Sequence, residues 1–162
     1  MTRDHRAPQE RSQAGGVYVE FLIAFLPVFF FFLGLVQLAF VQVANLVVKH
    51  AATKAVRAAV VVLPDDPQYY GGVAVGSYSG QRRSDIERAA QIPLATLGLL
   101  EAATAKVSIN TAYSRNALLT AQVDFQYHCK VPWGRFVVCG LTNFKKISGQ
   151  ATMTAQGALY EY

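Results

Sequence analysis

The sequence is poor in the residue types from which most enzymes build their active sites. Charged residues make up only 15% of the 162 residues, and there are three histidines and two cysteines. The histidines lie far apart, and the chain has no Gly-Lys-Ser/Thr phosphate loop, no His-Glu-x-x-His motif and no Gly-x-Ser-x-Gly elbow. We therefore expect a non-enzymatic protein with no catalytic residues, no cofactor and no metal ion.

Basic charge is present but is not concentrated in one place. The formal net charge is +5, and after residue 48 the chain has 12 Lys and Arg against 7 Asp and Glu. These charges are spread over the whole segment, whereas nucleic-acid-binding domains usually cluster their basic residues on one face. We expect no nucleic-acid partner. A basic domain near anionic lipid or cell-surface polymer accounts for the charge.

One long hydrophobic run holds most of the apolar excess. Residues 21–48 carry no charge, and seven of the ten phenylalanines lie between Phe21 and Phe40. A bilayer core about 30 Å thick is crossed by about 20 helical residues. The run therefore predicts one transmembrane helix, with the span at about residues 21–44; a buried helix of a soluble fold is the alternative. The run contains three polar side chains, those of Gln37, Gln42 and Asn45. They could leave the hydrocarbon or bond to a neighbouring helix.

The residues just before this run suggest a device for assembly. Glu20 precedes the run directly, and a carboxylate at the membrane boundary usually has a partner and a function. The simpler interpretation is that Glu20 marks the interface, at a helix N-terminus that favours an anion. Cleavage after Gly15 would make Gly16 the new N-terminus and Glu20 the fifth residue. The Glu20 carboxylate could then neutralise the N-terminal amine of a neighbouring subunit within lipid.

This region resembles a prepilin, and more fully the TadE-like minor pseudopilins of Flp (tight adherence, or Tad) type IVb pilus systems. A secretory signal differs, because its small-residue cleavage site follows a short apolar stretch. A weaker similarity to the closing strand of that family covers residues 147–153. The main resemblance rests on Gly15 followed by Gly16-Val17-Tyr18-Val19-Glu20-Phe21, on the long apolar stretch, and on Gln42-Val43-Ala44-Asn45 leading into the Ala-rich residues 51–62.

The resemblance implies an orientation and a set of partners. A prepilin peptidase would cut on the cytoplasmic side after Gly15, with Gly16 as a competing position. The protein would then span the cytoplasmic (inner) membrane once, with its C-terminal domain periplasmic or extracellular. The implied partners are the prepilin peptidase, other pilins and pseudopilins, the Tad inner-membrane assembly platform and membrane lipid. Charge alone leaves the orientation open, because three Lys or Arg residues lie close to each side of the run.

The alternative function is that of an uncleaved single-pass accessory or binding protein of the cell envelope. The two hypotheses differ in processing, because only the pseudopilin would lose its leader. On the pseudopilin hypothesis the chain divides into a leader at residues 1–15, a long helix at 16–63 and a soluble α+β domain at 64–162.

The helical pattern continues beyond the apolar run. Residues 49–57 place a basic, polar face beside a face rich in alanine, and Pro64 ends the pattern. A second helix is expected from Asp85 to Ala103, with Ser84 and Glu87 as a capping box at its start. Pro93 would kink this helix or divide it into two.

Alternating apolar and polar residues from Leu119 to Lys130 predict a half-buried strand. A shorter strand at Val107 and Ile109, a segment at 136–139 and a strand at 147–160 would complete an antiparallel sheet of three or four strands. The outer domain is therefore predicted to be α+β, with its helices on one face of the sheet.

The nine residues between Cys129 and Cys139 include the stretch 131–135, whose Pro132 and Gly134 favour a turn between strands. Two cysteines on the outward side of a membrane suggest a disulfide; the alternative is two buried thiols. We expect no zinc site, because His128 is the only nearby histidine and four ligands cannot be assembled.

Overall fold

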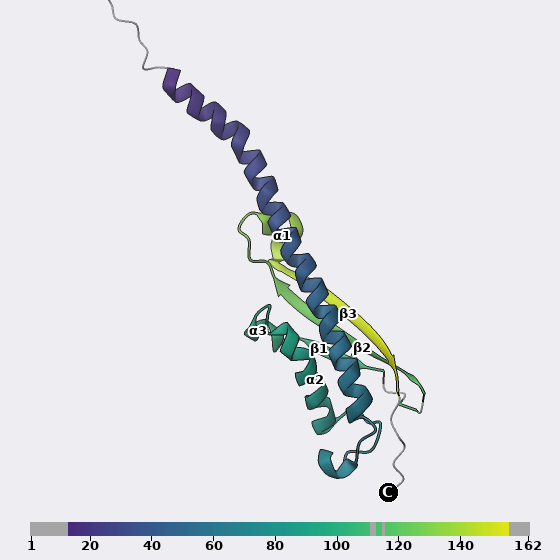
Figure 1. The fold of residues 1–162 in the computed structure, drawn as a ribbon. Helices are drawn as coiled ribbons and strands as arrows, with labels where there is room; N and C mark the ends of the chain where they lie inside the picture. Colours follow the sequence, from purple (N-terminus) through teal and green to yellow (C-terminus); the bar gives the residue numbers. More distant parts are fainter. Residues whose placement is uncertain (1–12, 111–112, 115, 156–162) are drawn as a thin grey trace, which may run out of the picture.

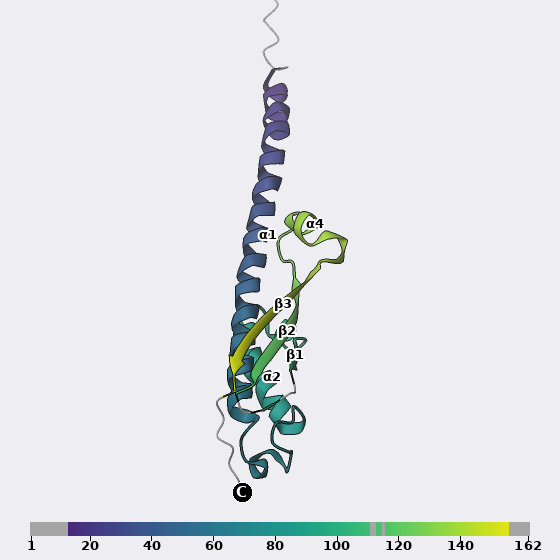
Figure 2. The same cartoon turned by 90° about the vertical axis from the view of Figure 1, so that its right-hand side faces the viewer.

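The computed structural model describes residues 13–110, 113–114 and 116–155, and its longest element is the N-terminal helix. Helix α1 (Gln13–Val62) has 50 residues and is about 75 Å long at 1.5 Å per residue. Figures 1 and 2 show it as a long rod, with a small domain packed along its C-terminal half. Leu63 and Pro64 follow the helix, as the turn signal at Pro64 predicts.

The sheet contains three antiparallel strands in the order β1-β2-β3. Strand β1 (Lys106–Ile109) is short, whereas β2 (Leu118–His128) and β3 (Phe144–Thr154) pair over their whole length. Buried and exposed residues alternate along β2, in agreement with the sequence pattern. One face of the sheet therefore covers a core, and the predicted α+β class is confirmed.

The core lies where α1 packs against both the sheet and helix α2 (Gly80–Leu94). The alanine-rich face of α1 is fully buried there, and small side chains let the neighbouring elements approach closely. The opposite face carries the basic residues, which stay exposed. The fully buried residues of this α1 face include Ala44, Val48, Ala51, Ala52, Ala55, Val56 and Ala59.

The second helix begins earlier than predicted, and the helical region divides into two just after Pro93, which is one of the two outcomes that this proline predicts. Helix α2 begins at Gly80, and Ser84 and Glu87 do not form a capping box. The Ser84 hydroxyl donates to the backbone carbonyl of Gln81, and Glu87 forms an ion pair with Arg83 at 2.8 Å. Pro93 lies in the last turn, and the one-turn helix α3 (Leu99–Ala102) follows separately.

The prediction of a strand at residues 136–139 is wrong. These residues belong to helix α4 (Gly134–Val138) and its C-cap, Cys139, and the short 3₁₀ helix η3 (Gly140–Thr142) comes next. The segment connects β2 to β3 at the hairpin end that points toward the N-terminal half of α1 (Figure 2). It packs against α1 and not along a strand edge. A second 3₁₀ helix, η2 (Pro67–Tyr70), lies in the predicted loop after Pro64.

Candidate membrane and assembly site

The two glycines of the predicted cleavage site lie in the first turns of α1. A Cβ atom added at Gly15 or Gly16 would meet nothing within 4 Å, apart from the local backbone of the helix itself. Two adjacent glycines also weaken a helical turn, because each costs about 1 kcal/mol relative to alanine. The described part of the chain therefore does not cover this site, which lies on backbone that unwinds at low cost.

Glu20 lies on the same side of α1 as these glycines. Gly15, Gly16, Val19, Glu20, Ile23 and Ala24 line an open hollow on the helix surface. The Glu20 side chain is exposed, and within the part of the chain that the structure describes it forms no ion pair. A carboxylate thus stands beside a strip of small residues, at the start of an apolar surface.

That apolar surface is exposed all around the helix. No residue from Val17 to Phe32 is buried, and successive rings stack along it, with Phe21 and Phe25 centroids 5.4 Å apart. Among the described residues, α1 is the one helix long and apolar enough to cross a membrane. No part of its most apolar 18-residue stretch is buried in the structure. A core helix of a soluble fold would be buried there, so α1 suggests a single-pass membrane protein.

The environment of α1 changes at Gln37. This side chain is fully buried, and its Oε1 accepts a hydrogen bond from the backbone N–H of Val131 at 2.9 Å. Its Nε2 lies 4.0 Å from the sulfur of Cys139. The polar groups of Gln37 therefore bond to the chain's own outer domain, and not to solvent or to another helix.

Two glycines bring the outer domain against the backbone of α1. A Cβ at Gly134 would lie 2.5 Å from the carbonyl oxygen of Leu33, and a Cβ at Gly149 would lie 2.8 Å from that of Val48. Real Cβ atoms do not approach backbone so closely. Glycine at these two positions lets α4 and β3 pack directly on α1 at two different heights.

At the far end of α1, a fully buried arginine bonds to the last carbonyl of the helix and to three carbonyls of the segment that follows it. The Arg82 guanidinium donates to the carbonyls of Val62, Leu63, Asp65 and Val73, and it lies 4.3 Å from the ring centroid of Tyr70. The last carbonyls of a helix have no intrahelical partner and carry partial negative charge. One cation thus caps α1 and ties down the loop that follows it.

The structure joins Cys129 and Cys139 in a disulfide, with Cα atoms 6.6 Å apart. The bond closes the connection between β2 and β3, which contains α4. Trp133, at the start of α4, has a positive φ of 65°, which non-glycine residues rarely adopt. Its ring centroid lies 5.4 Å from that of Phe30 on α1.

The structure therefore groups the predicted residues in two places. Gly15, Gly16 and Glu20 share one face at the start of α1, and the cysteine pair lies beside the middle of the helix. Sequence reasoning missed Arg82, whose role depends on a contact between distant segments. A glycine inside a strand pattern often marks a close backbone approach, so Gly149 was detectable.

Comparison with known proteins supports the family resemblance for part of the chain. Residues 15–57 match the family model described as TadE-like protein. This segment includes Gly15, Gly16, Glu20 and the first part of α1 that packs against the outer domain. No curated protein and no solved structure matches the chain. The match relates the chain to Tad pilus systems, and it ends before the sheet begins.

Proposed function

We infer from the TadE-like segment at residues 15–57 that the chain is a minor pseudopilin that acts in assembly of a Tad pilus or a related secretion machine. A prepilin peptidase removes residues 1–15 at the cytoplasmic face of the inner membrane. The domain after Pro64 lies on the other side, in the periplasm or outside the cell. The protein works by binding other pilins and the assembly platform, and it is not an enzyme.

The exposed Glu20 carboxylate is the observation that carries this proposal. An ionised group at the edge of an apolar span is costly unless a partner of opposite charge is present. Cleavage after Gly15 creates such a partner, because it leaves an ammonium group on Gly16. Cleavage removes Gly15 from the hollow beside Glu20 and leaves Gly16 without a side chain there, so a neighbouring chain has room to approach the carboxylate.

Processing is tested with two matched variants, Gly15→Leu and Gly16→Leu, in cells with an active prepilin peptidase. We expect wild-type protein to begin at Gly16 and Gly15→Leu to keep its full length. N-terminal sequencing of Gly16→Leu separates the two cleavage positions, because a cut after Gly15 leaves leucine as its first residue. An intact N-terminus on mature wild-type protein contradicts the proposal and favours an uncleaved envelope accessory protein.

The ion pair is tested with Glu20→Gln, which keeps the shape of the side chain and removes its charge. We expect this variant to be cleaved normally but to lose co-purification with the other pilins. Glu20→Asp serves as the control, because it keeps the charge on a shorter stem. If Glu20→Gln associates as well as wild type, the ammonium–carboxylate mechanism is wrong.

A further inference from the structure

The connection between β2 and β3 exposes an unusual amount of apolar surface. We call residues 129–144 the closed loop: the disulfide joins Cys129 to Cys139, and residues 140–144 lead from Cys139 into the start of β3. Soluble surfaces seldom carry large contiguous apolar patches without a binding role. The exposed fractions of its large side chains are 61% for Trp133, 47% for Phe136, 79% for Val137, 90% for Leu141 and 53% for Phe144.

The closed loop lies at the depth of the membrane span. It packs against Leu33 and Gln37, and Trp133 contacts Phe30. A span of about 20 residues that begins at Phe21 ends at Phe40, and one that begins at Val17 ends at Val36. Phe30 and Leu33 fall inside the hydrocarbon in either case. The loop therefore lies beside the half of the span nearer the outer domain and not above the membrane.

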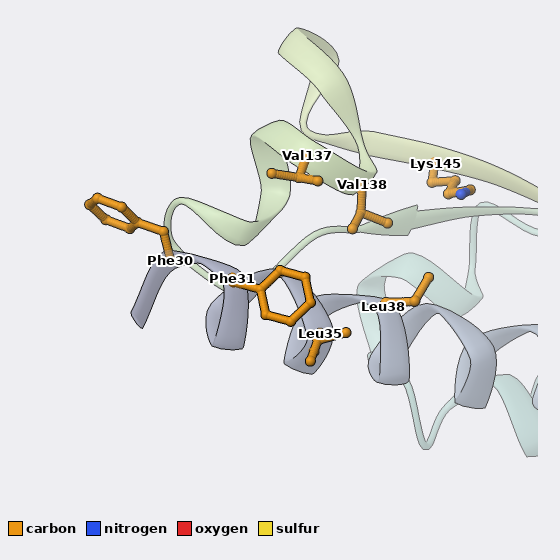
Figure 3. Close-up of a pocket in the computed structure, with 8 residues that line it drawn as sticks. Phe30, Phe31, Leu35, Leu38, Val137, Val138 and Lys145 are labelled. Carbon is orange, nitrogen blue, oxygen red and sulfur yellow. The ribbon is translucent and has the colours of Figure 1, made fainter. Parts of the chain in front are cut away.

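An apolar groove runs between α1 and the closed loop. Its walls are formed by Phe30, Phe31, Leu35 and Leu38 on one side and by Val137 and Val138 on the other. Figure 3 shows Lys145 at the Leu38 end of the groove, away from Phe30. The charged end of the groove is thus the end nearer the outer domain, and its apolar end points toward the middle of the membrane.

The charge of this region has one sign. The segment from Cys129 to Lys146 contains Lys130, Arg135, Lys145 and Lys146, and it contains no Asp or Glu. Basic residues next to a membrane are attracted to anionic headgroups. An apolar patch bordered by cations fits an anionic phospholipid layer.

We propose that the closed loop is a second membrane element, which inserts its apolar side chains into the leaflet nearer the outer domain. An acyl chain of an anionic phospholipid occupies the groove, and its phosphate meets the Lys145 ammonium. The groove continues the exposed apolar surface of α1, which is the basis for choosing lipid as the occupant. The proposal rests on the membrane span alone and is independent of cleavage or pilus assembly.

Trp133 provides the test, because it is the only tryptophan in the chain. The full chain is placed in nanodiscs that hold one copy each, made from lipids with brominated acyl chains, which quench tryptophan fluorescence on contact. We expect blue-shifted emission and at least two-fold stronger quenching by brominated lipid than by aqueous acrylamide. Red-shifted emission that acrylamide quenches and brominated lipid does not would overturn the proposal.

A control variant places the probe at the other end of the exposed helix surface. Val61 is 67% exposed and lies near the end of α1. In Trp133→Phe combined with Val61→Trp, the new tryptophan should therefore show red-shifted emission that acrylamide quenches. Leu141→Asp with Val137→Asp alters exposed positions only and should reduce the lipid quenching of Trp133 at least two-fold. Lys145→Glu should leave the quenching in place but weaken the preference for anionic over zwitterionic lipid, because Lys130, Arg135 and Lys146 remain.

A second copy of the chain is the other possible occupant of the groove. In that case, Trp133 emission would shift to the blue only when two copies share a nanodisc. Such dependence on copy number overturns the proposal, whereas the same emission at one and two copies per nanodisc supports it.

Discussion

The two halves of helix α1 have nearly opposite surfaces. From Val17 to Val36, the membrane half, large side chains stand outward, and Phe31 is 69% exposed. From Gln37 to Val62, the covered half, alanines such as Ala52 are fully buried and the cations keep to one face. A helix that is apolar all around fits lipid, whereas a one-sided helix fits a protein core. The periodicity of polar residues thus separates the two environments along one continuous element.

The uncharged run does not coincide with the membrane half. The run extends to Val48, but the outer domain already covers Gln37, Val41 and Ala44. The predicted span at residues 21–44 therefore includes positions that contact protein and not lipid. The absence of charge marks where α1 avoids water, and it does not distinguish lipid from a protein interior.

The substitution expected to destabilise the covered half most, relative to the membrane half, is Arg82→Ala, which acts at the end of α1. The change removes a buried cation from four backbone carbonyls and should cost about 3 to 5 kcal/mol of folding free energy. Hydrogen exchange of the full chain in detergent micelles should become faster at residues 59–63 and unchanged at residues 21–32. Arg82→Lys keeps the charge but has fewer hydrogen-bond donors, so its effect should be intermediate. Equal exchange in Arg82→Ala and wild type would show that the cap is dispensable.

Breaking the disulfide should loosen the boundary between the two halves. The double variant Cys129→Ser with Cys139→Ser should lower the unfolding free energy by about 2 to 3 kcal/mol, because the bond closes a short loop. Thermal unfolding of the full chain, with and without reductant, measures this. Wild type should respond to the reductant and the double variant should not. Thiol labelling of both cysteines in exported, unreduced protein would contradict an oxidised pair.

The next effect comes from filling the close contact between β3 and the covered half. Gly149→Ala places a Cβ against the backbone of Val48 and Lys49, so the sheet must shift, at about 1 to 3 kcal/mol. Gly34→Ala is the matched control in the membrane half, because its Cβ meets nothing outside the helix. We expect thermal unfolding at lower temperature for Gly149→Ala only. Equal melting temperatures for the two variants would mean that β3 is able to move away from α1 freely.

The smallest effect lies on the outer face of the sheet, away from α1. The Ser148 hydroxyl donates to Asp124 at 2.6 Å, and this bond lowers the pKa of the Asp124 carboxyl. Ser148→Ala should cost about 0.5 kcal/mol at pH 7. A lowered pKa contributes stability above the ordinary aspartate value, and that contribution disappears on acidification. The difference between wild type and Ser148→Ala in urea unfolding should therefore shrink as the pH falls below the ordinary aspartate pKa of 3.8, and vanish once the pH is below the lowered pKa. A difference that stays constant with pH would assign the effect to packing.

Much of the fold follows from local patterns. The length of α1, the alternation along β2 and the basic face after residue 48 all depend on periodicity, which the sequence states directly. The pairing of Cys129 with Cys139 was also accessible, because the two residues flank a turn. The candidate residues Gly15, Gly16 and Glu20 needed only their order along the chain.

The failures share a dependence on distant contacts. Val137 and Val138 favour a strand locally, but the disulfide and the approach of Gly134 to Leu33 hold this segment as a helix. Likewise α2 begins at Gly80, ahead of the expected capping box, and its first turn carries the buried Arg82 to the end of α1. A contact that spans 20 residues leaves no trace in a local pattern.

The continuity of α1 has a mechanical consequence. The sheet is fixed to the covered half at Gly149, and the same ladder of backbone hydrogen bonds runs on toward Glu20. Pro27 is the one proline inside the helix, and it lacks the N–H that would complete its rung. A pulling force on the outer domain is therefore transmitted along a stiff rod to the proposed subunit contact, and Pro27 is the point at which that rod bends most easily.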